Sequence, residues 1–198
     1  MLDKTIPFYS LIMETEHPDE YPRFDLPDGF SFVLWEPGLE TEWARIHTDL
    51  GQFKSIEEGE KVFAGEFLDR PELARKRCFF VKAANGAVVA TASLWDGDLF
   101  GPILPRIHWV AVAPAWQGYG LAKALLSHLF DLFQAVEAGH YLYLVTQTWS
   151  FKAIHLYQRF GFRPYRGPRP QNSTNVNFTE DNIKAWDLVG ERLKQDRT

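Results

Sequence analysis

The segment from Ile107 to Ala122 constrains the fold of this chain more than any other. It reads IHWVAVAPAWQGYGLA, and an amphipathic run with leucines at helical spacing follows it. An apolar run that ends at a proline, then small turn residues, then such a run predicts a strand, a tight turn and a helix. A unit of this kind needs both a sheet and a helix-covered core, so it predicts a domain that contains both.

The turn from Gln117 to Ala122 has the features of an anion site. Gly118 and Gly120 remove side chains where another group would approach the backbone closely. The first turn of the following helix presents unpaired N–H groups and the positive end of the helix dipole, which suit a pyrophosphate. The dinucleotide fingerprint does not match because Lys123 stands where its third glycine belongs, and the Gly-Lys-Ser/Thr of a nucleotide P-loop is absent. A mere tight connection between two elements is the alternative.

The motif Gln117-x-x-Gly120-x-Ala122 resembles the coenzyme A turn, Gln/Arg-x-x-Gly-x-Gly/Ala, of the GNAT superfamily of N-acetyltransferases. The preceding Val110-x-Val112-x-Pro114 is similar to that superfamily as well. A second similarity, Ala153-Ile154-x-Leu156-Tyr157-x-x-Phe160-Gly161-Phe162, follows the next expected strand. The resemblance extends over residues 30–165 and implies an α/β (α+β) fold with a mixed, mostly antiparallel, splayed central sheet flanked by helices.

The resemblance also implies acetyl-CoA as co-substrate and direct attack of a primary amine on its thioester in a ternary complex. The pantetheine arm would pair with the backbone of Val110, Ala111 and Val112. The N–H groups of the turn would hold the pyrophosphate, and the residues concerned are Gln117, Gly118, Tyr119, Gly120, Leu121 and Ala122. The acceptor would be a small-molecule or peptide amine. A non-catalytic module that binds acyl-CoA is the alternative function, and a transferase for longer acyl or aminoacyl groups is a third.

Two residues are candidates for catalysis. Tyr157 matches the superfamily tyrosine that protonates the departing thiolate, and packing on its helix face is the alternative. His108 is the candidate base, because the arylalkylamine branch of the superfamily has a similarly placed histidine. We expect its side chain to share a strand face with Val110 and Val112. A histidine that caps a strand edge or packs under a loop is the alternative.

The chain departs from the superfamily pattern at two positions. Ser150 stands where an asparagine is common, and it would cap the next helix and bond the pantetheine at shorter reach. Gln117 replaces an arginine, so Lys123 and Lys152 are possible substitutes for its charge, although both suit an ordinary surface. The acceptor site would come from residues 45–68 and 95–106, with these candidates, each also readable as a loop or surface residue: His47, Asp49, Trp95, Asp96 and Asp98.

The remaining elements follow from hydrophobic period and turn signals. Residues 1–29 hold four prolines and are expected to be an extension that wraps the surface, with Ile6 to Met13 docked in extended form, while 30–198 form a single domain. Thr179 is expected to cap a last helix, and a strand at Ala185 to Val189 is the alternative. The expected strands are 30–35, 78–82, 88–94, 107–112, 141–145 and 162–165, and the expected helices are 40–50, 56–68, 120–136 and 151–159.

Composition excludes some classes of function. The chain has 198 residues and a formal net charge of −5, which argues against nucleic acid as a partner. Its single cysteine, Cys78, lies in an apolar run and is expected to be a buried core residue. The apolar runs are short for a membrane helix and no signal peptide is evident, so we expect a cytoplasmic protein that needs no metal. The extension and the proline-rich segment 164–170 could contribute to a homodimer.

Overall fold

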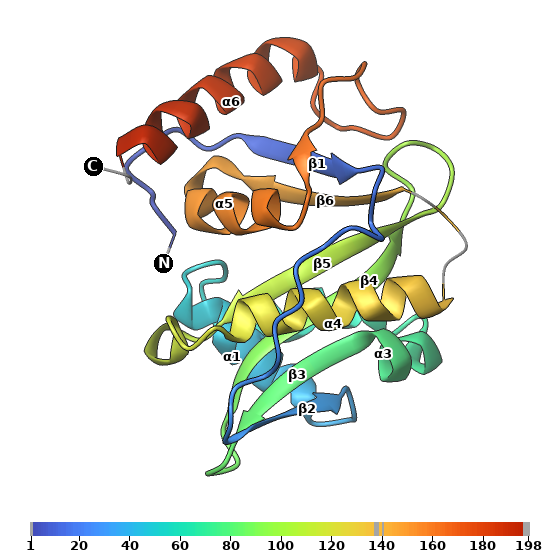
Figure 1. The fold of residues 1–198 in the computed structure, drawn as a ribbon, viewed down its shortest axis with the longest axis vertical. Helices are drawn as coiled ribbons and strands as arrows, with labels where there is room; N and C mark the ends of the chain where they lie inside the picture. Colours follow the sequence, from blue (N-terminus) through green and yellow to red (C-terminus); the bar gives the residue numbers. More distant parts are fainter. Residues whose placement is uncertain (1, 137–138, 140, 196–198) are drawn as a thin grey trace. The chain divides into compact units, whose positions relative to one another are not determined.

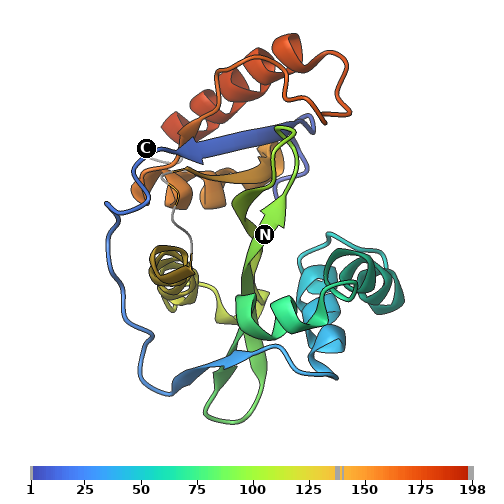
Figure 2. The same cartoon turned by 90° about the vertical axis from the view of Figure 1, so that its right-hand side faces the viewer.

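The computed structural model describes residues 2–136, 139 and 141–195 and is shown in Figures 1 and 2. The hydrogen-bonded order of its seven strands is β2-β3-β4-β5-β6-β1-β7. The chain divides into two compact units, and strands β4 and β5 contribute residues to both. The first unit consists of Arg23–Leu94 and His108–Phe133, and the second of Leu2–Pro22, Trp95–Ile107 and the described residues of Gln134–Thr198.

The first unit is a set of strands with helices on both sides. Its strands are β2 (Phe30–Leu34), β3 (Cys78–Ala83), most of β4 (Val88–Gly97) and the end of β5 (Leu104–Val112). Figure 2 shows α4 (Leu121–Val136) on one side of these strands and α1 (Leu39–Asp49) with α2 (Ile56–Phe67) on the other. The short helix α3 (Pro71–Arg77) leads directly into β3.

Local sequence explains these elements. Ser55 caps α2 by accepting a hydrogen bond from Glu58 N at 3.2 Å, and Glu58 Oε2 accepts one from Lys54 N at 2.7 Å. The β3–β4 hairpin turns at Gly86, whose φ is +84°, while Asn85 Oδ1 accepts a hydrogen bond from Ala87 N at 3.1 Å. Strands β2 and β3, and β3 and β4, pair antiparallel.

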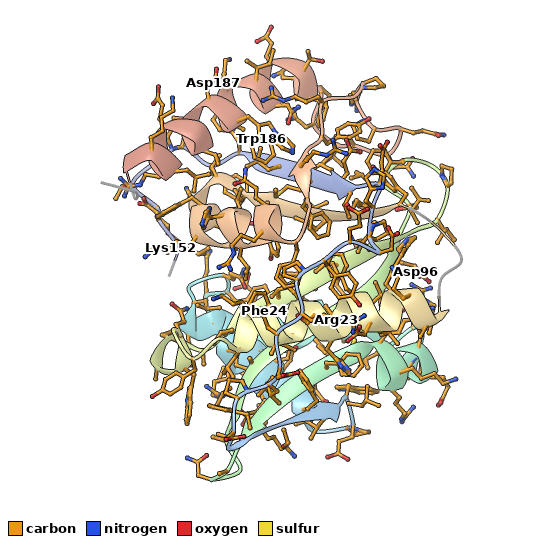
Figure 3. The ribbon with its side chains drawn as sticks, viewed as in Figure 1. Arg23, Phe24, Asp96, Lys152, Trp186 and Asp187 are labelled. Atoms are coloured by element: carbon orange, nitrogen blue, oxygen red, sulfur yellow. The ribbon has the colours of Figure 1, made fainter. Side chains whose placement is uncertain are left out.

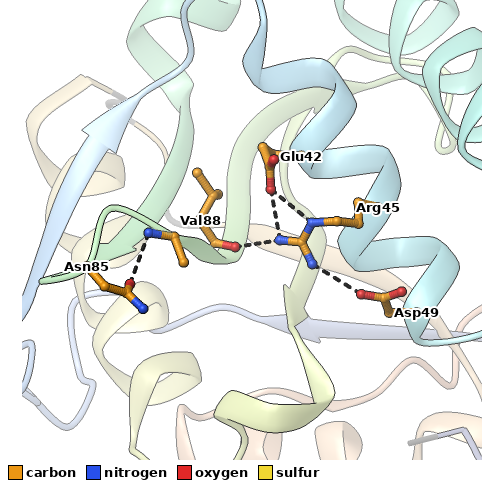
Figure 4. A network of polar contacts seen from close by, with 6 residues as sticks. Glu42, Arg45, Asp49, Asn85 and Val88 are labelled. Atoms are coloured by element: carbon orange, nitrogen blue, oxygen red, sulfur yellow. Dashed lines mark hydrogen bonds and ion pairs between the residues drawn. The ribbon is translucent and has the colours of Figure 1, made fainter.

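Arg45 ties α1 to the start of β4 (Figure 4). Its Nη2 atom donates to Val88 O at 2.7 Å, and the same guanidinium pairs with Glu42 at 2.8 Å and with Asp49 at 3.1 Å. The planar guanidinium therefore satisfies a strand carbonyl and two helix carboxylates at once, which a lysine ammonium would do less well.

The second unit is built on β6 (Leu142–Gln147), which pairs parallel with β5 at Arg106↔Tyr143 and Ile107↔Leu144. The first strand, β1 (Ser10–Thr15), pairs antiparallel with β6 over six residues and with β7 (Arg163–Pro164) over two. Helices α5 (Phe151–Arg159) and α6 (Phe178–Gln195) complete the unit. The mixed sheet is thus mostly antiparallel and flanked by helices, as the resemblance implied.

The N-terminal segment differs from its expected surface course. Leu11 and Met13 are fully buried, and Ile12 belongs to a core cluster with Tyr143, Tyr165 and Phe178. The expected surface course is therefore wrong for Ser10–Thr15, because its apolar residues fill both faces of a strand inside the sheet. The extended docking expected for Ile6 to Met13 is confirmed for its residues within β1.

Three smaller expectations also change. Helix α3 was not predicted, although Pro71 at its first turn and Glu72 beside it are ordinary helix-start residues. The last segment is helix α6 and not a strand, but it begins at Phe178, so Thr179 lies inside the first turn and does not cap it. The expected strand 162–165 is reduced to the two residues of β7.

Candidate active site

The turn that follows β5 has the geometry of an open anion cradle. A single 3₁₀ turn, Pro114–Trp116, leads from the strand into it, and Gly118 and Gly120 have φ of +88° and +83°. Gly120 O accepts the first helical hydrogen bonds, from Lys123 N at 3.0 Å and Ala124 N at 3.2 Å. A Cβ placed on either glycine would meet no atom within 4 Å, so the space beside this backbone is open to a ligand.

Strand β5 meets this turn through a side-chain contact. Gln117 Nε2 donates to Val112 O at 3.2 Å, so the residue that replaces arginine in the motif fastens the turn to the strand. Ala111 and Leu121 are buried and belong to the core through their side chains, which leaves only their backbone for a ligand. Val110, Val112 and Ala122 are half-buried.

Aromatic rings surround the turn. Tyr119 is 55% exposed, and its ring lies 5.9 Å from that of Trp116 and 6.0 Å from that of Phe30. On α4, Lys123 Nζ lies 5.3 Å from the centre of the Phe24 ring. The segment around Phe24, labelled in Figure 3, is held to α4 because Phe24 N donates to Ser127 Oγ at 2.9 Å and Arg23 pairs with Asp131 at 2.6 Å.

Trp109 is an irregular position within the continuous strand β5. Its φ is +52°, which is uncommon for a residue other than glycine and interrupts the alternation of side chains between the two sheet faces. The Trp109 ring packs at 5.0 Å from the rings of Trp43 and His47, both on α1, and at 5.7 Å from that of Phe53. Such backbone conformations cost free energy and cluster at functional sites.

His108 lies immediately before this interruption. Its Nε2 atom is 2.9 Å from Glu66 Oε2 on α2, and its ring is 6.0 Å from that of Phe67. The expectation that His108 shares a face with Val110 and Val112 depended on strict alternation, and the left-handed Trp109 between them removes that basis. Both His108 and Trp109 face helices α1 and α2 instead.

His47 belongs to an aromatic cluster with Trp43, Phe53 and Trp109. It is fully buried, and burial lowers its pKa to about 3, so its ring is neutral. Its Nδ1 atom is hydrogen-bonded to Gln52 Oε1, whereas its Nε2 atom and the Nε1 atom of Trp109 are buried without a hydrogen-bond partner among the described residues. His47 is thus a buried member of this aromatic cluster.

Tyr157 belongs to the second unit, on α5. It is 7% exposed, and burial raises the pKa of its phenol, so the hydroxyl keeps its proton. The backbone around it is anchored because Tyr157 O accepts hydrogen bonds from Phe160 N at 2.9 Å and Phe162 N at 3.1 Å. Ser150 occupies the N-cap position of this helix, but its side chain makes no capping hydrogen bond. Lys152 is exposed, at the place labelled in Figure 3.

Several acceptor candidates have structural contacts of their own. Asp49 pairs with Arg45, and Trp95 is buried at 2% exposure. Asp98 is exposed and receives the Asn172 Nδ2 group on its backbone oxygen at 2.7 Å, whereas Asp96 is half-buried. Asp49 and Asp98 thus have partners within the protein, and Trp95 belongs to the core.

Sequence reasoning missed Glu66 and the conformation of Trp109. Glu66 lies one helical turn after Val62 and next to Phe67 on α2. A charged residue next to these apolar ones was the available sequence signal for a buried polar contact. Nothing in the letter sequence marks Trp109 as left-handed, because that conformation usually calls for glycine or asparagine.

Comparison with known proteins agrees with this geometry. Residues 39–162 match the model of the acetyltransferase (GNAT) family. The chain belongs to this family. The match begins at the first residue of α1 and ends just after α5, so it includes the turn, His108 and Tyr157, and it excludes β1, β2 and α6.

A curated relative is the streptothricin acetyltransferase of Streptomyces lavendulae, which is 29% identical over 138 residues. The match covers 68% of this chain and 64% of that protein, so the chain spans somewhat less than two thirds of its relative.

Solved structures share the fold. A GCN5-related N-acetyltransferase from Sphaerobacter thermophilus superposes with a TM-score of 0.60 at 22% identity, over 79% of this chain and 48% of that one. A GNAT-family acetyltransferase from Colwellia psychrerythraea superposes with a TM-score of 0.57 at 17% identity, over 80% and 54% of the two chains.

Other features of the described residues bear on function. Within residues 2–136, 139 and 141–195, no helix is long and apolar enough to cross a membrane, and no group of three or more His, Cys, Asp or Glu residues is placed to hold a metal ion. Cys78 is 2% exposed, and burial raises the pKa of its thiol, so its expected role as a core residue is confirmed. The cytoplasmic location and the homodimer stay predictions.

Proposed function

We propose that this protein is an N-acetyltransferase that transfers an acetyl group from acetyl-CoA to a primary amine. The observation that carries the proposal is the turn from Gln117 to Ala122. Two glycines with positive φ, open space beside them and the start of a 16-residue helix together suit a pyrophosphate. Membership in the GNAT family supports acetyl-CoA as the molecule that carries it.

The chemistry requires no covalent enzyme intermediate. The amine nitrogen attacks the thioester carbonyl, the carbon–nitrogen bond forms, and the carbon–sulfur bond breaks to release the coenzyme A thiolate. Positioning of the two bound reactants supplies about 7–11 kcal/mol of the barrier reduction, whereas a general base or acid supplies about 3–5 kcal/mol. The buried Cys78 suits this direct route, because it offers no accessible nucleophile.

We assign the general acid to Tyr157 and the general base to His108. A phenol whose pKa is raised by burial stays protonated and can donate to the thiolate, whose conjugate acid has a pKa near ~8.5. A primary amine has a pKa near ~10 and arrives protonated, so a neutral histidine beside it can remove the proton, directly or through water. Backbone groups of Val110 and Val112 would pair with the pantetheine.

Streptothricin is the first acceptor to test. The curated relative is named for the acetylation of this compound, and at 29% identity it is a reason to begin an amine screen there. The screen should continue with polyamines, amino acids and aromatic amines, because the fold does not select among them.

The decisive experiment compares two glycines of equal backbone strain. Gly120 and Gly86 have φ of +83° and +84°, and a Cβ on either would meet no atom within 4 Å. Gly120→Ala and Gly86→Ala should therefore cost similar stability, about 1–2 kcal/mol each. Titration calorimetry with acetyl-CoA should show binding by the wild type and by Gly86→Ala, and at least 10-fold weaker binding by Gly120→Ala. Gly120→Trp should abolish it.

If both alanine variants bind acetyl-CoA with the same affinity, the cofactor does not bind at this turn. Release of coenzyme A thiol from acetyl-CoA in the presence of amines then tests catalysis. Binding without thiol release from any amine would favour the alternative, a module that binds acyl-CoA without reacting.

A further inference from the structure

The contact between the Glu66 carboxylate and the His108 ring has no role in the scheme above. We propose, resting on the proposed function, that Glu66 is a positioning residue that holds His108 in the tautomer whose Nδ1 atom takes the proton of the amine. No part of the family motifs includes Glu66, which lies 42 residues from His108 in the chain.

The geometry of the pair is well defined. Glu66 Oε2 lies 2.9 Å from His108 Nε2, which is ordinary for a charge-assisted hydrogen bond. The side chain of His108 is 15% exposed and that of Glu66 is 33% exposed, so the pair is partly shielded from water and still reachable. The contact joins α2 to β5 at the residue next to the strained Trp109.

The chemistry of the two groups sets the tautomer. An ionised carboxylate has only acceptor oxygens, so the hydrogen of this bond must be on Nε2 of His108. In the neutral imidazole the lone pair is then on Nδ1, which is the nitrogen that can accept a proton. After transfer, the imidazolium carries a positive charge beside Glu66, and the carboxylate offsets that charge.

The proton and bond changes balance. One N–H bond of the substrate ammonium breaks and the proton goes to Nδ1 of His108, which frees the nitrogen lone pair for attack. The carbon–nitrogen bond then forms and the carbon–sulfur bond breaks. The thiolate receives its proton from Tyr157, and no oxidant or further reactant is needed.

The backbone of His108 is held independently of Glu66. Ser93 Oγ donates to His108 O at 2.8 Å, and the left-handed Trp109 sets the direction of the strand after it. Glu66 on α2 contacts the His108 ring, and His47 on α1 lies near enough for a charge interaction with it. His47 is neutral, because burial lowers its pKa to about 3. Of Glu66 and His47, only Glu66 therefore places a negative charge next to the His108 ring.

Three variants separate positioning from plain structural support. Glu66→Gln keeps an oxygen that accepts from Nε2 but removes the charge, and Glu66→Leu removes both. The control is Glu60→Gln on the same helix, because Glu60 Oε1 also bonds a neighbouring helix through Thr41 Oγ1 at 2.5 Å. All three should keep the wild-type affinity for acetyl-CoA in calorimetry.

The pH dependence of kcat/KM is the kinetic readout. We expect Glu66→Gln to move the acidic limb of the profile to lower pH and to lower kcat/KM by about 10-fold, which is less than the roughly 10²–10⁴-fold that the general base itself supplies. Glu66→Leu should lose more than Glu66→Gln, mainly in kcat, and Glu60→Gln should keep the wild-type profile. A wild-type profile in both Glu66 variants would overturn the proposal.

The tautomer can be measured without catalysis. Long-range ¹H–¹⁵N spectra of the histidine rings should show His108 protonated on Nε2 in the wild type and in Glu66→Gln, and a tautomer mixture in Glu66→Leu. An Nδ1-protonated ring in the wild type would refute the positioning role even in an active enzyme. Conversely, an Nε2-protonated ring in a protein that acetylates no amine would place the failure in the proposed function.

Discussion

The ring of His47 lies 5.0 Å from the ring of Trp109, with an angle of 78° between their planes. His47 is fully buried among Trp43, Phe53 and Trp109, and this environment lowers its pKa from 6.5 to about 3. A histidine that stays neutral in the folded state and titrates normally in the unfolded chain links stability to pH.

The first prediction concerns acid stability. Below pH 6.5 the unfolded chain protonates His47, and the folded protein does not until about pH 3, so the unfolded state binds more protons across this window. The free energy of unfolding should therefore fall as pH falls, by at most about 1.4 kcal/mol per pH unit from this group. Urea denaturation at several pH values between these limits measures the slope.

One variant separates the contribution of His47. His47→Leu should lower stability at neutral pH, and it should reduce the slope of the unfolding free energy against pH by the contribution of one protonated group. A slope in His47→Leu equal to that of the wild type would mean that other groups cause the acid sensitivity.

The second prediction contrasts two glycines on α2. A Cβ on Gly59 would lie 2.7 Å from Ala44 Cβ and 2.9 Å from Ala44 Cα, so α1 and α2 would have to separate. A Cβ on Gly65 would meet nothing within 4 Å. Gly59→Ala should lose about 1–3 kcal/mol by overpacking, which exceeds its gain in helix propensity, and Gly65→Ala should gain about 0.5–1 kcal/mol.

Thermal or urea denaturation of the two variants checks this contrast, since they make the same chemical change on one helix. Stabilisation of both would show that α1 and α2 do not approach closely at Ala44.

Local patterns predicted most elements of the fold, because each pattern contains its own start and end signals. The hairpin at Asn85-Gly86, the proline at the end of β5 and the glycines before α4 act within a few residues. Strand pairing partners are not local. The sequence of Ser10–Thr15 indicates an extended segment, but its place between β6 and β7 depends on residues more than 100 positions away.

The third prediction tests whether β1 is integral to the fold. Leu11 on β1 is fully buried, whereas Leu34 on β2 is 43% exposed. Leu11→Ala should cost about 2–5 kcal/mol through lost burial and a cavity, and Leu34→Ala should cost less than half of that. Urea denaturation followed by tryptophan fluorescence measures both. Similar small losses for the two variants would indicate that β1 is dispensable.

The candidate site was predictable only where a motif is contiguous. The turn from Gln117 to Ala122 could be identified because its glycines and helix start lie next to one another. Glu66 reaches His108 only through the packing of α2 on the sheet, and Trp109 has a φ of +52° in a position where its ring packs on that of Trp43. Tertiary contacts of this kind have no local sequence signal.

The fourth prediction concerns the hydroxyl of Tyr157. Removal of this one oxygen by Tyr157→Phe leaves the buried ring in place, so stability should change by less than about 1 kcal/mol. If the phenol protonates the thiolate, kcat should fall by about 10²-fold, while the affinity for acetyl-CoA in calorimetry stays the same.

Tyr165→Phe is the matched control, because that phenol donates to Pro168 O at 2.9 Å within a separate core cluster. Loss of the Tyr165 hydroxyl should lower the free energy of unfolding slightly and leave kcat unchanged. Acetyl donors with different thiols add a second test, because departure of the thiolate without a general acid depends more strongly on the pKa of its thiol. An acetyl donor whose thiol has a lower pKa should therefore rescue Tyr157→Phe more than the wild type. Equal rescue of both would show that the Tyr157 side chain only packs on its face of α5.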